Sequence, residues 1–191
     1  KIVHYDDGIK LLKKLPNLLD YKLNSLVFNF IDMLSHARSE MKLFKNLAYD
    51  EKSYRSLTLS WFKNSPLNKV LSFLSNEDVK VIITTDHGTV KVDKPIKIIG
   101  DRNTNSNLRF KKGKNLNFKN DDLFVCRNPE KFMLPQENIN TSYVFTRESQ
   151  YLIYPKDYNY HVKKFKDSFQ HGGISMEEII IPFIELESKK N

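Results

Sequence analysis

An aspartate, a histidine and a glycine follow a short apolar run in the middle of the sequence. The run covers residues 79–85, is rich in β-branched side chains, and leads directly into Asp86, His87 and Gly88. An apolar run of this length, bounded by turn residues, predicts a buried and parallel strand. Ligands of open α/β sheets gather at the carboxyl ends of such strands.

The chemistry of this triplet allows two interpretations. A carboxylate and a neutral imidazole suit a divalent metal of the zinc or manganese type. Gly88 would let the backbone turn away after the two side chains. An ordinary polar turn after a strand explains the same residues, and the triplet alone does not decide between these interpretations.

A second aspartate and histidine stand four residues apart. Asp32 follows the apolar run 26–31, which we expect to form another buried strand, and His36 comes next. If a helix begins near Asp32, this spacing puts both side chains on one helix face.

A third histidine precedes two glycines near the end of the chain. His171, Gly172 and Gly173 predict a loop that leads to a short acidic turn and a closing strand at 179–186. All three groups therefore lie at strand ends or in loops, where functional side chains collect. Two carboxylates and three imidazoles in matched settings favour a metal site, whereas His4 and His161 lack such a setting.

Composition limits the class of protein. The chain has 191 residues, a net charge of +8, 40% hydrophobic and 12% aromatic residues, which predicts one folded domain and excludes a disordered segment. The positive charge favours an anionic partner such as a phosphate ester, nucleic acid or acidic lipid. Cys126 is the only cysteine, which excludes an internal disulfide and suits a reducing compartment. The sequence shows no signal peptide and no membrane-spanning apolar run.

Helices and strands both follow from the periodicity. Residues 40–74 repeat apolar side chains at helical spacing, while 95–99 and 123–126 predict strands. Residues 142–146 and 151–154 predict a hairpin around 147–150. We therefore expect an α/β fold.

A basic stretch lies between these elements. Residues 91–119 hold nine Lys or Arg and two Asp. A solvated loop and a loop that holds an anionic substrate explain this charge equally well.

The three groups together resemble a known family. The order Asp-x-x-x-His, Asp-His-Gly and His-Gly-Gly is similar to the metal-ligand pattern of the alkaline phosphatase superfamily, and within it to the PglZ domain. The runs 29–38, 100–102 and 171–178 resemble PorX-like response regulators of Bacteroidetes, which carry a PglZ output domain and are linked to type IX secretion. The resemblance covers nearly the whole chain as the carboxyl-terminal part of such a domain.

The resemblance implies a fold and a ligand set. It implies a mostly parallel sheet flanked by helices, and a single domain over residues 1–191. Asp32, His36 and His171 would hold one metal ion and Asp86 and His87 a second, most simply two zinc ions. A further Asp and a Thr or Ser nucleophile have no counterpart in these residues, so we expect them upstream and expect this segment alone to be inactive.

The resemblance also implies a function. Phosphoryl transfer at two metal ions would act on a phosphodiester such as an oligonucleotide. Arg102 and Arg109 are the candidates for holding phosphate oxygens, while Glu177 and Glu178 would cap the following turn or orient His171.

The family also implies partners and a setting for this function. The partners are upstream receiver and helical domains, and the location is cytoplasmic without a membrane span. Whether the chain forms a homodimer is left open. The alternative is a non-enzymatic output module that binds a protein or nucleic acid.

Overall fold

Two compact units make up the chain, and each is described by itself. The computed structural model describes residues 1–101, 104–119 and 122–189, apart from the side chains of residues 36, 38–40, 42 and 45. Unit 1 is Lys1–Ile83 with Phe183–Asn191, and unit 2 is Thr84–Pro182. That residues 1–191 belong to a single domain stays a prediction. No helix among the described residues combines the length and apolarity needed to cross a membrane.

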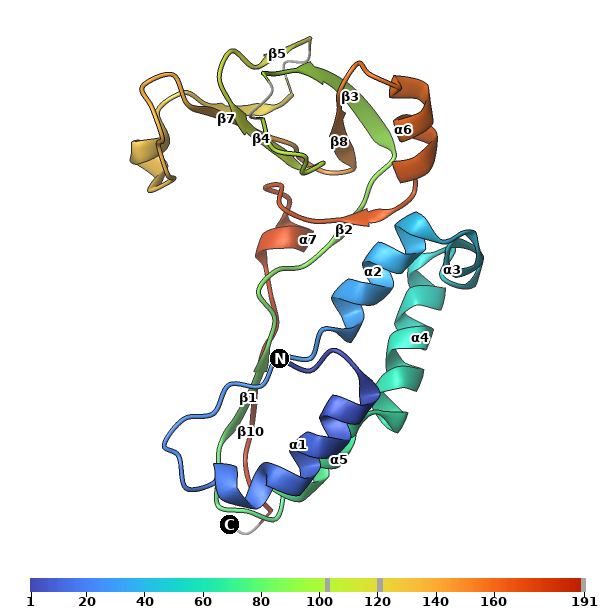
Figure 1. Ribbon diagram of the computed structural model, residues 1–191, viewed down its shortest axis with the longest axis vertical. Helices are drawn as coiled ribbons and strands as arrows, with labels where there is room; N and C mark the ends of the chain where they lie inside the picture. Colours follow the sequence, from blue (N-terminus) through green and yellow to red (C-terminus); the bar gives the residue numbers. More distant parts are fainter. Residues whose placement is uncertain (102–103, 120–121, 190–191) are drawn as a thin grey trace. The chain divides into compact units, whose positions relative to one another are not determined.

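Unit 1 is mainly helical. Its elements are α1 (Tyr5–Leu18), α2 (Phe30–Glu40), α3 (Lys42–Leu47), α4 (Glu51–Asn64), α5 (Pro66–Leu74), β1 (Val81–Thr84) and β10 (Phe183–Leu186) (Figure 1). The helical expectation for residues 40–74 is confirmed by α3, α4 and α5. Asp50 accepts a hydrogen bond from the Ser53 amide, which caps α4.

Helix α1 packs against α5 around the first core of the unit. Leu11, Leu15 and Val70 are buried there. A Cβ atom at Gly8 would lie 2.4 Å from Cβ of Pro66, so the two helices approach closely only because position 8 is glycine.

The apolar run 26–31 does not form the expected strand. Phe28 makes a single parallel bridge with Ile2, and α2 begins at Phe30. The Phe30 ring stacks on Trp61 with centroids 4.4 Å apart, so packing against α4 wins over strand propensity. The helix on which the shared face of Asp32 and His36 depends does form.

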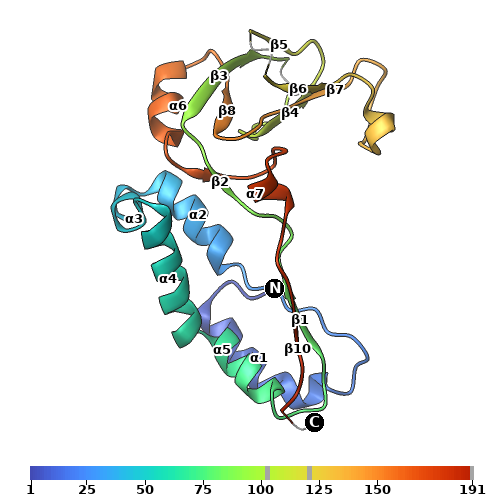
Figure 2. The same cartoon turned by 180° about the vertical axis from the view of Figure 1, so that it is seen from behind.

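Strands β1 and β10 pair with each other in a two-stranded ribbon, which both views show (Figure 2). Residues 81–84 thus form the predicted strand, but it is not deeply buried, since Ile82 is 50% exposed. Its partner comes from the end of the chain, and the contacts Lys80–Glu185 and Thr84–Pro182 make the pair antiparallel.

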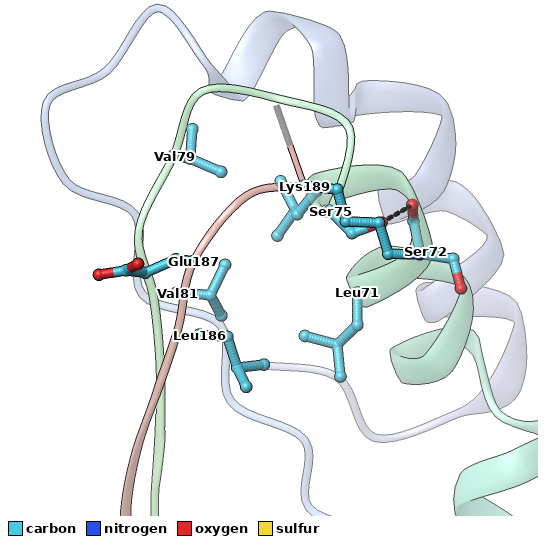
Figure 3. Close-up of a pocket in the computed structure, with 9 residues that line it drawn as sticks. Leu71, Ser72, Ser75, Val79, Val81, Leu186, Glu187 and Lys189 are labelled. Carbon is cyan, nitrogen blue, oxygen red and sulfur yellow. Dashed lines mark hydrogen bonds between the residues drawn. The ribbon is translucent and has the colours of Figure 1, made fainter. Parts of the chain in front are cut away.

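A cavity of about 320 Å³ lies between this ribbon and α5. Its apolar lining comes from Leu71, Leu74, Val79, Val81 and Leu186, with Ser72, Ser75, Glu187 and Lys189 at its polar parts (Figure 3).

Unit 2 is mainly built of short strands. Its elements are β2 (Val90–Lys91), β3 (Lys94–Ile99), β4 (Phe110–Gly113), β5 (Asn117–Phe118), β6 (Phe124–Cys126), η1 (Pro129–Phe132), β7 (Ser142–Phe145), β8 (Gln150–Ile153), α6 (Tyr158–Phe165), β9 (Phe169–Gln170) and α7 (Met176–Ile179). The sheets run β5-β3-β8, β4-β7-β6 and β2-β9. A mixed α/β fold is therefore confirmed.

Two cores lie on opposite sides of β8. Ile98, Val144 and Leu152 meet between the two three-stranded sheets, while Tyr151 and Ile153 pack toward α6. Because both faces of β8 are covered, all four of its residues are buried.

The sheets are less parallel than the resemblance implied. Among the described strands β3 and β8 pair in parallel, while β2–β9, β3–β5, β4–β7 and β6–β7 are antiparallel. Residues 142–146 and 151–154 do form strands, but the predicted hairpin does not exist. Strand β7 pairs with β4 and β6, and β8 pairs with β3, so the turn at 147–149 carries the chain from one sheet to the other.

One lysine of β4 lies inside unit 2. Lys111 is 1% exposed and stands opposite Val144 of β7, on the core side of its sheet. Its Nζ atom donates to the Asn105 carbonyl at 3.2 Å and lies 4.3 Å from the Tyr154 ring centre. Burial lowers the pKa of Lys111 to about 8, because the charged form loses its hydration.

This burial predicts a pH-dependent stability. Between pH 8 and the ordinary lysine pKa of 10.5, the unfolded chain binds a proton that the folded chain does not. The free energy of unfolding should therefore rise with pH across this window, by at most about 3 kcal/mol. Lys111→Met should remove this rise, as measured by urea unfolding at pH 8 and pH 10. The same slope in both proteins would contradict the assignment.

Candidate metal centre

The pairing of β2 with β9 explains why two distant histidines meet. Val90 stands opposite Gln170 and Lys91 opposite Phe169. The antiparallel register therefore brings the residues before Val90 next to those after Gln170. The rings of His87 and His171 stack with centroids 3.7 Å apart and planes inclined by 9°. A ring nitrogen of each lies within 4.8 Å of one on the other.

The turn after β1 presents Asp86 and His87 on the same side. The Thr85 hydroxyl donates to the His87 carbonyl at 3.0 Å, which closes the turn. Nδ1 of His87 lies 3.0 Å from the Gly88 carbonyl, and a proton donated there leaves Nε2 with its lone pair. Nε2 is 3.7 Å from Oδ1 of Asp86, whose side chain is 88% exposed. Carboxylate and imidazole donors thus gather in one place.

Gly88 is required for a different reason from the sharp turn expected of it. Its amide donates to the Glu178 carbonyl at 2.9 Å. A Cβ atom at this position would lie 1.9 Å from the Glu177 carbonyl oxygen. The segment that carries His87 can therefore reach the segment after His171 only through a residue without a side chain.

A buried ion pair holds the second of these segments. The Arg109 guanidinium donates from Nε and Nη2 to the two Glu178 carboxylate oxygens at 2.8 and 2.7 Å, with both side chains at most 2% exposed. The same guanidinium donates to Ser175 Oγ and to the Gln150 carbonyl. The carboxylate also accepts from the amides of Gly173 and Ser175. Glu178 therefore caps α7, as we predicted, and its partner Arg109 was not foreseen.

The surroundings of Glu178 favour its ionised form. Burial alone raises the pKa of the Glu178 carboxyl. The hydrogen bonds and positive charge of Arg109, together with the amides of Gly173 and Ser175, outweigh burial and lower this pKa below its ordinary value.

The two glycines after His171 fit around this pair. Gly172 has a φ of +104°, which favours glycine. A Cβ atom at Gly173 would lie 2.7 Å from Oε2 of Glu178 and 2.8 Å from Nη2 of Arg109. The two glycines after His171 therefore let the chain pass close over the buried ion pair.

The structure changes our view of the two arginines. Arg109 is 0% exposed and its donors are engaged inside unit 2, which leaves no guanidinium face for a phosphate. The phosphate-binding role that we expected of Arg109 with the implied function is therefore wrong. Arg102 lies outside the described residues.

Asp32 and His36 lie on α2 of unit 1, one helical turn apart as we predicted. Asp32 is half-buried in the first turn, where its carboxylate accepts from the Asn29 side chain at 3.4 Å. The Tyr54 hydroxyl donates to the Ile31 carbonyl at 3.1 Å and fixes the start of the helix to α4. The side chain of His36 lies outside the described part. Whether these two residues join Asp86, His87 and His171 stays a prediction.

The mixed α/β fold and the histidine pair agree with the alkaline phosphatase-like class that the order of the ligand residues resembles. The sequence model of the BREX system PglZ alkaline phosphatase-like domain matches residues 2–186, so the chain belongs to the PglZ family. A search of the curated proteins found no match.

The ion pair yields the next prediction. Arg109→Met should lower the free energy of unfolding of unit 2 by about 3–5 kcal/mol, because Glu178 stays buried without its partner. The double variant Arg109→Met, Glu178→Met should recover much of this loss. In the wild type, the stabilisation should fade as the pH drops below the ordinary Glu178 pKa of 4.5, since that pKa is lowered by folding.

Arg55→Met provides the matched control for chemical unfolding. Arg55 pairs with Glu51 on the exposed side of α4, where both side chains are more than 60% exposed, and its loss should cost under about 1 kcal/mol. Equal losses in the Arg55 and Arg109 variants would show that the buried pair is not stabilising.

Proposed function

We propose that this chain supplies metal ligands and substrate contacts of a metal-dependent phosphodiesterase. The observation that carries the proposal is the stacked pair His87 and His171 beside Asp86, in a member of an alkaline phosphatase-like family. Families of this class use divalent metals, and imidazole nitrogen and carboxylate oxygen are normal zinc ligands.

We assign these donors to two ions. By the family order, Asp86 and His87 would hold one, and Asp32, His36 and His171 the other. Ions of two-metal sites are about 3.5–4 Å apart, so ligands of different ions are expected to be neighbours. The contact between His87 and His171 supports this arrangement, since the family order assigns them to different ions. Zinc is our choice because imidazole nitrogen predominates.

Bound divalent ions supply charge stabilisation for the phosphoryl oxygens during hydrolysis. The residues of this chain orient the donors. The Gly88 carbonyl sets the tautomer of His87, and the Arg109–Glu178 pair fixes the loop that carries His171. We assign the nucleophile to none of these residues. The Thr84 and Thr85 hydroxyls donate to the carbonyls of Pro182 and His87.

A phosphodiester is favoured over a monoester by the runs that resemble PorX-like regulators. The same resemblance supports a cytoplasmic response regulator with receiver and helical domains, linked to type IX secretion. The net charge of +8 suits a polyanionic substrate.

One observation favours the alternative of a binding module. Phe183 and Ile184 of β10 are 67% and 46% exposed, and such apolar side chains suit a protein partner. A metal-free protein with its regulatory effect intact would favour this second function.

The ligand assignment predicts loss of metal and activity together. His171→Ala and His87→Ala should each lower zinc content. Each should also lower the hydrolysis of bis(p-nitrophenyl) phosphate by the full-length protein by about 100-fold or more. Metal content by mass spectrometry and initial rates provide the measurement. His161→Ala is the control, since this histidine stacks on Phe165 of α6. Full zinc content in the His171 variant would refute the assignment.

Arg102 generates a separate prediction. If it holds substrate phosphate, Arg102→Ala should lower kcat/KM for the phosphodiester by about 10-fold or more, as expected for a lost charged hydrogen bond. Its zinc content should not change. Loss of zinc or of folding in this variant would mark a structural residue instead, and Arg55→Ala again provides the exposed-arginine control.

A further inference from the structure

Three phenylalanines stand in line across one sheet of unit 2. Phe145 of β7 lies opposite Phe110 of β4 on one side and Phe124 of β6 on the other. Directly opposite residues project from the same face of a sheet. The ring centroids are 5.8 Å apart for Phe110 and Phe145, and 6.2 Å for Phe124 and Phe145.

Phe132 of η1 extends this line. Its ring meets Phe124 edge to face at 5.5 Å and is 53% exposed. We call Phe110, Phe145, Phe124 and Phe132 the phenylalanine row. The first three rings are half-buried.

This face is not the main core of the sheet. The core side carries Lys111 and Val144, which are at most 1% exposed. On the face of the row, the segment after η1 contacts the sheet at Tyr143. The Tyr143 hydroxyl donates to the Pro135 carbonyl at 2.7 Å, and Tyr143 is buried. Phe110, Phe124 and Phe145 keep part of their surface exposed on this face, and Phe132 is exposed.

The row begins beside the candidate metal centre. A Cβ atom at Gly172 would lie 3.2 Å from the Phe110 ring, and Gly172 follows His171 directly. The Ile174 amide donates to the Thr146 carbonyl at 3.1 Å, which fixes the same loop to the end of β7. A chain molecule that reaches the histidine pair with one group can therefore lie along the row with the next.

The chemistry of the row suits nucleobases. Aromatic rings spaced by about one nucleotide are the usual platform for single-stranded nucleic acid, and they work together with basic side chains that follow the phosphates. Arg127 and Lys131 are exposed near the far end of the row, whereas Lys112 shares its face but is paired with Glu137. A duplex does not fit, because its bases are stacked and paired inside.

We propose that the phenylalanine row binds successive bases of a single-stranded oligonucleotide whose scissile phosphodiester lies at the metal centre. This inference rests on the proposed function and names its substrate class. Phe110 takes the base nearest the reacting phosphate, and Phe145, Phe124 and Phe132 take those that follow.

The test measures binding in the presence of EDTA, so that it does not depend on hydrolysis. The probe is a fluorescein-labelled oligothymidylate of about ten nucleotides, followed by fluorescence anisotropy. Phe124→Leu and Phe145→Leu keep an apolar side chain and remove the ring, and each should weaken binding about tenfold. Tyr160→Leu is the matched control, because Tyr160 is a 65% exposed aromatic residue on α6, outside the row.

A second reporter guards against variants that fold poorly. Trp61 is the only tryptophan and stacks on Phe30 in unit 1, so Trp61→Phe removes the background. Phe132→Trp in that protein places one tryptophan on an exposed ring of the row. Single-stranded oligothymidylate should quench its fluorescence, while the matching duplex and inorganic tripolyphosphate should not.

The outcomes separate the inference from the proposed function. Unchanged affinity in both leucine variants, or equal binding of duplex and single strand, would overturn the proposal that the phenylalanine row binds bases. Ring-dependent binding in a protein that hydrolyses no phosphodiester supports the row and removes the proposed function. Hydrolysis of bis(p-nitrophenyl) phosphate with no ring-dependent binding supports the proposed function and overturns the role of the phenylalanine row.

Discussion

The buried pair of Arg109 and Glu178 is the interaction on which the arrangement of unit 2 depends. Two charges without solvent are stable only when their hydrogen bonds are satisfied, and here Ser175, Gln150 and the amide of Gly173 complete them. These partners belong to β8 and to the loop before α7. One ion pair therefore fixes that loop to the sheet, and the loop carries His171.

Close neighbours explain the glycines of the site. Gly173 passes within van der Waals contact of both charged side chains, and Gly88 contacts the backbone of Glu177. Removing side chains at these points lets two chain segments approach until the rings of His87 and His171 stack. The site is thus set by the close backbone approach of the two segments that carry the imidazoles.

Local patterns in the sequence predicted the local features. The helical spacing of Asp32 and His36, the strands at 81–84 and 95–99, and the capping role of Glu178 all follow from neighbouring residues. What the sequence could not predict were pairings over long distances. The hairpin around 147–150 fails because β7 and β8 find partners in different sheets, and no local signal encodes those partners. Arg109 was misjudged for the same reason, since its carboxylate lies 69 residues away.

The alternation of β4 corrects the view of the basic stretch. Arg109 and Lys111 are both buried, one in an ion pair and the other against Tyr154, while Phe110 between them projects to the opposite face. Two of the cations that made 91–119 look like a phosphate-binding loop therefore contribute no surface charge. The strand presents an aromatic ring where the sequence suggested a cation. If the proposed oligonucleotide lies along β4, its binding there should depend more on stacking than on charge, and should be less sensitive to salt than a purely electrostatic contact.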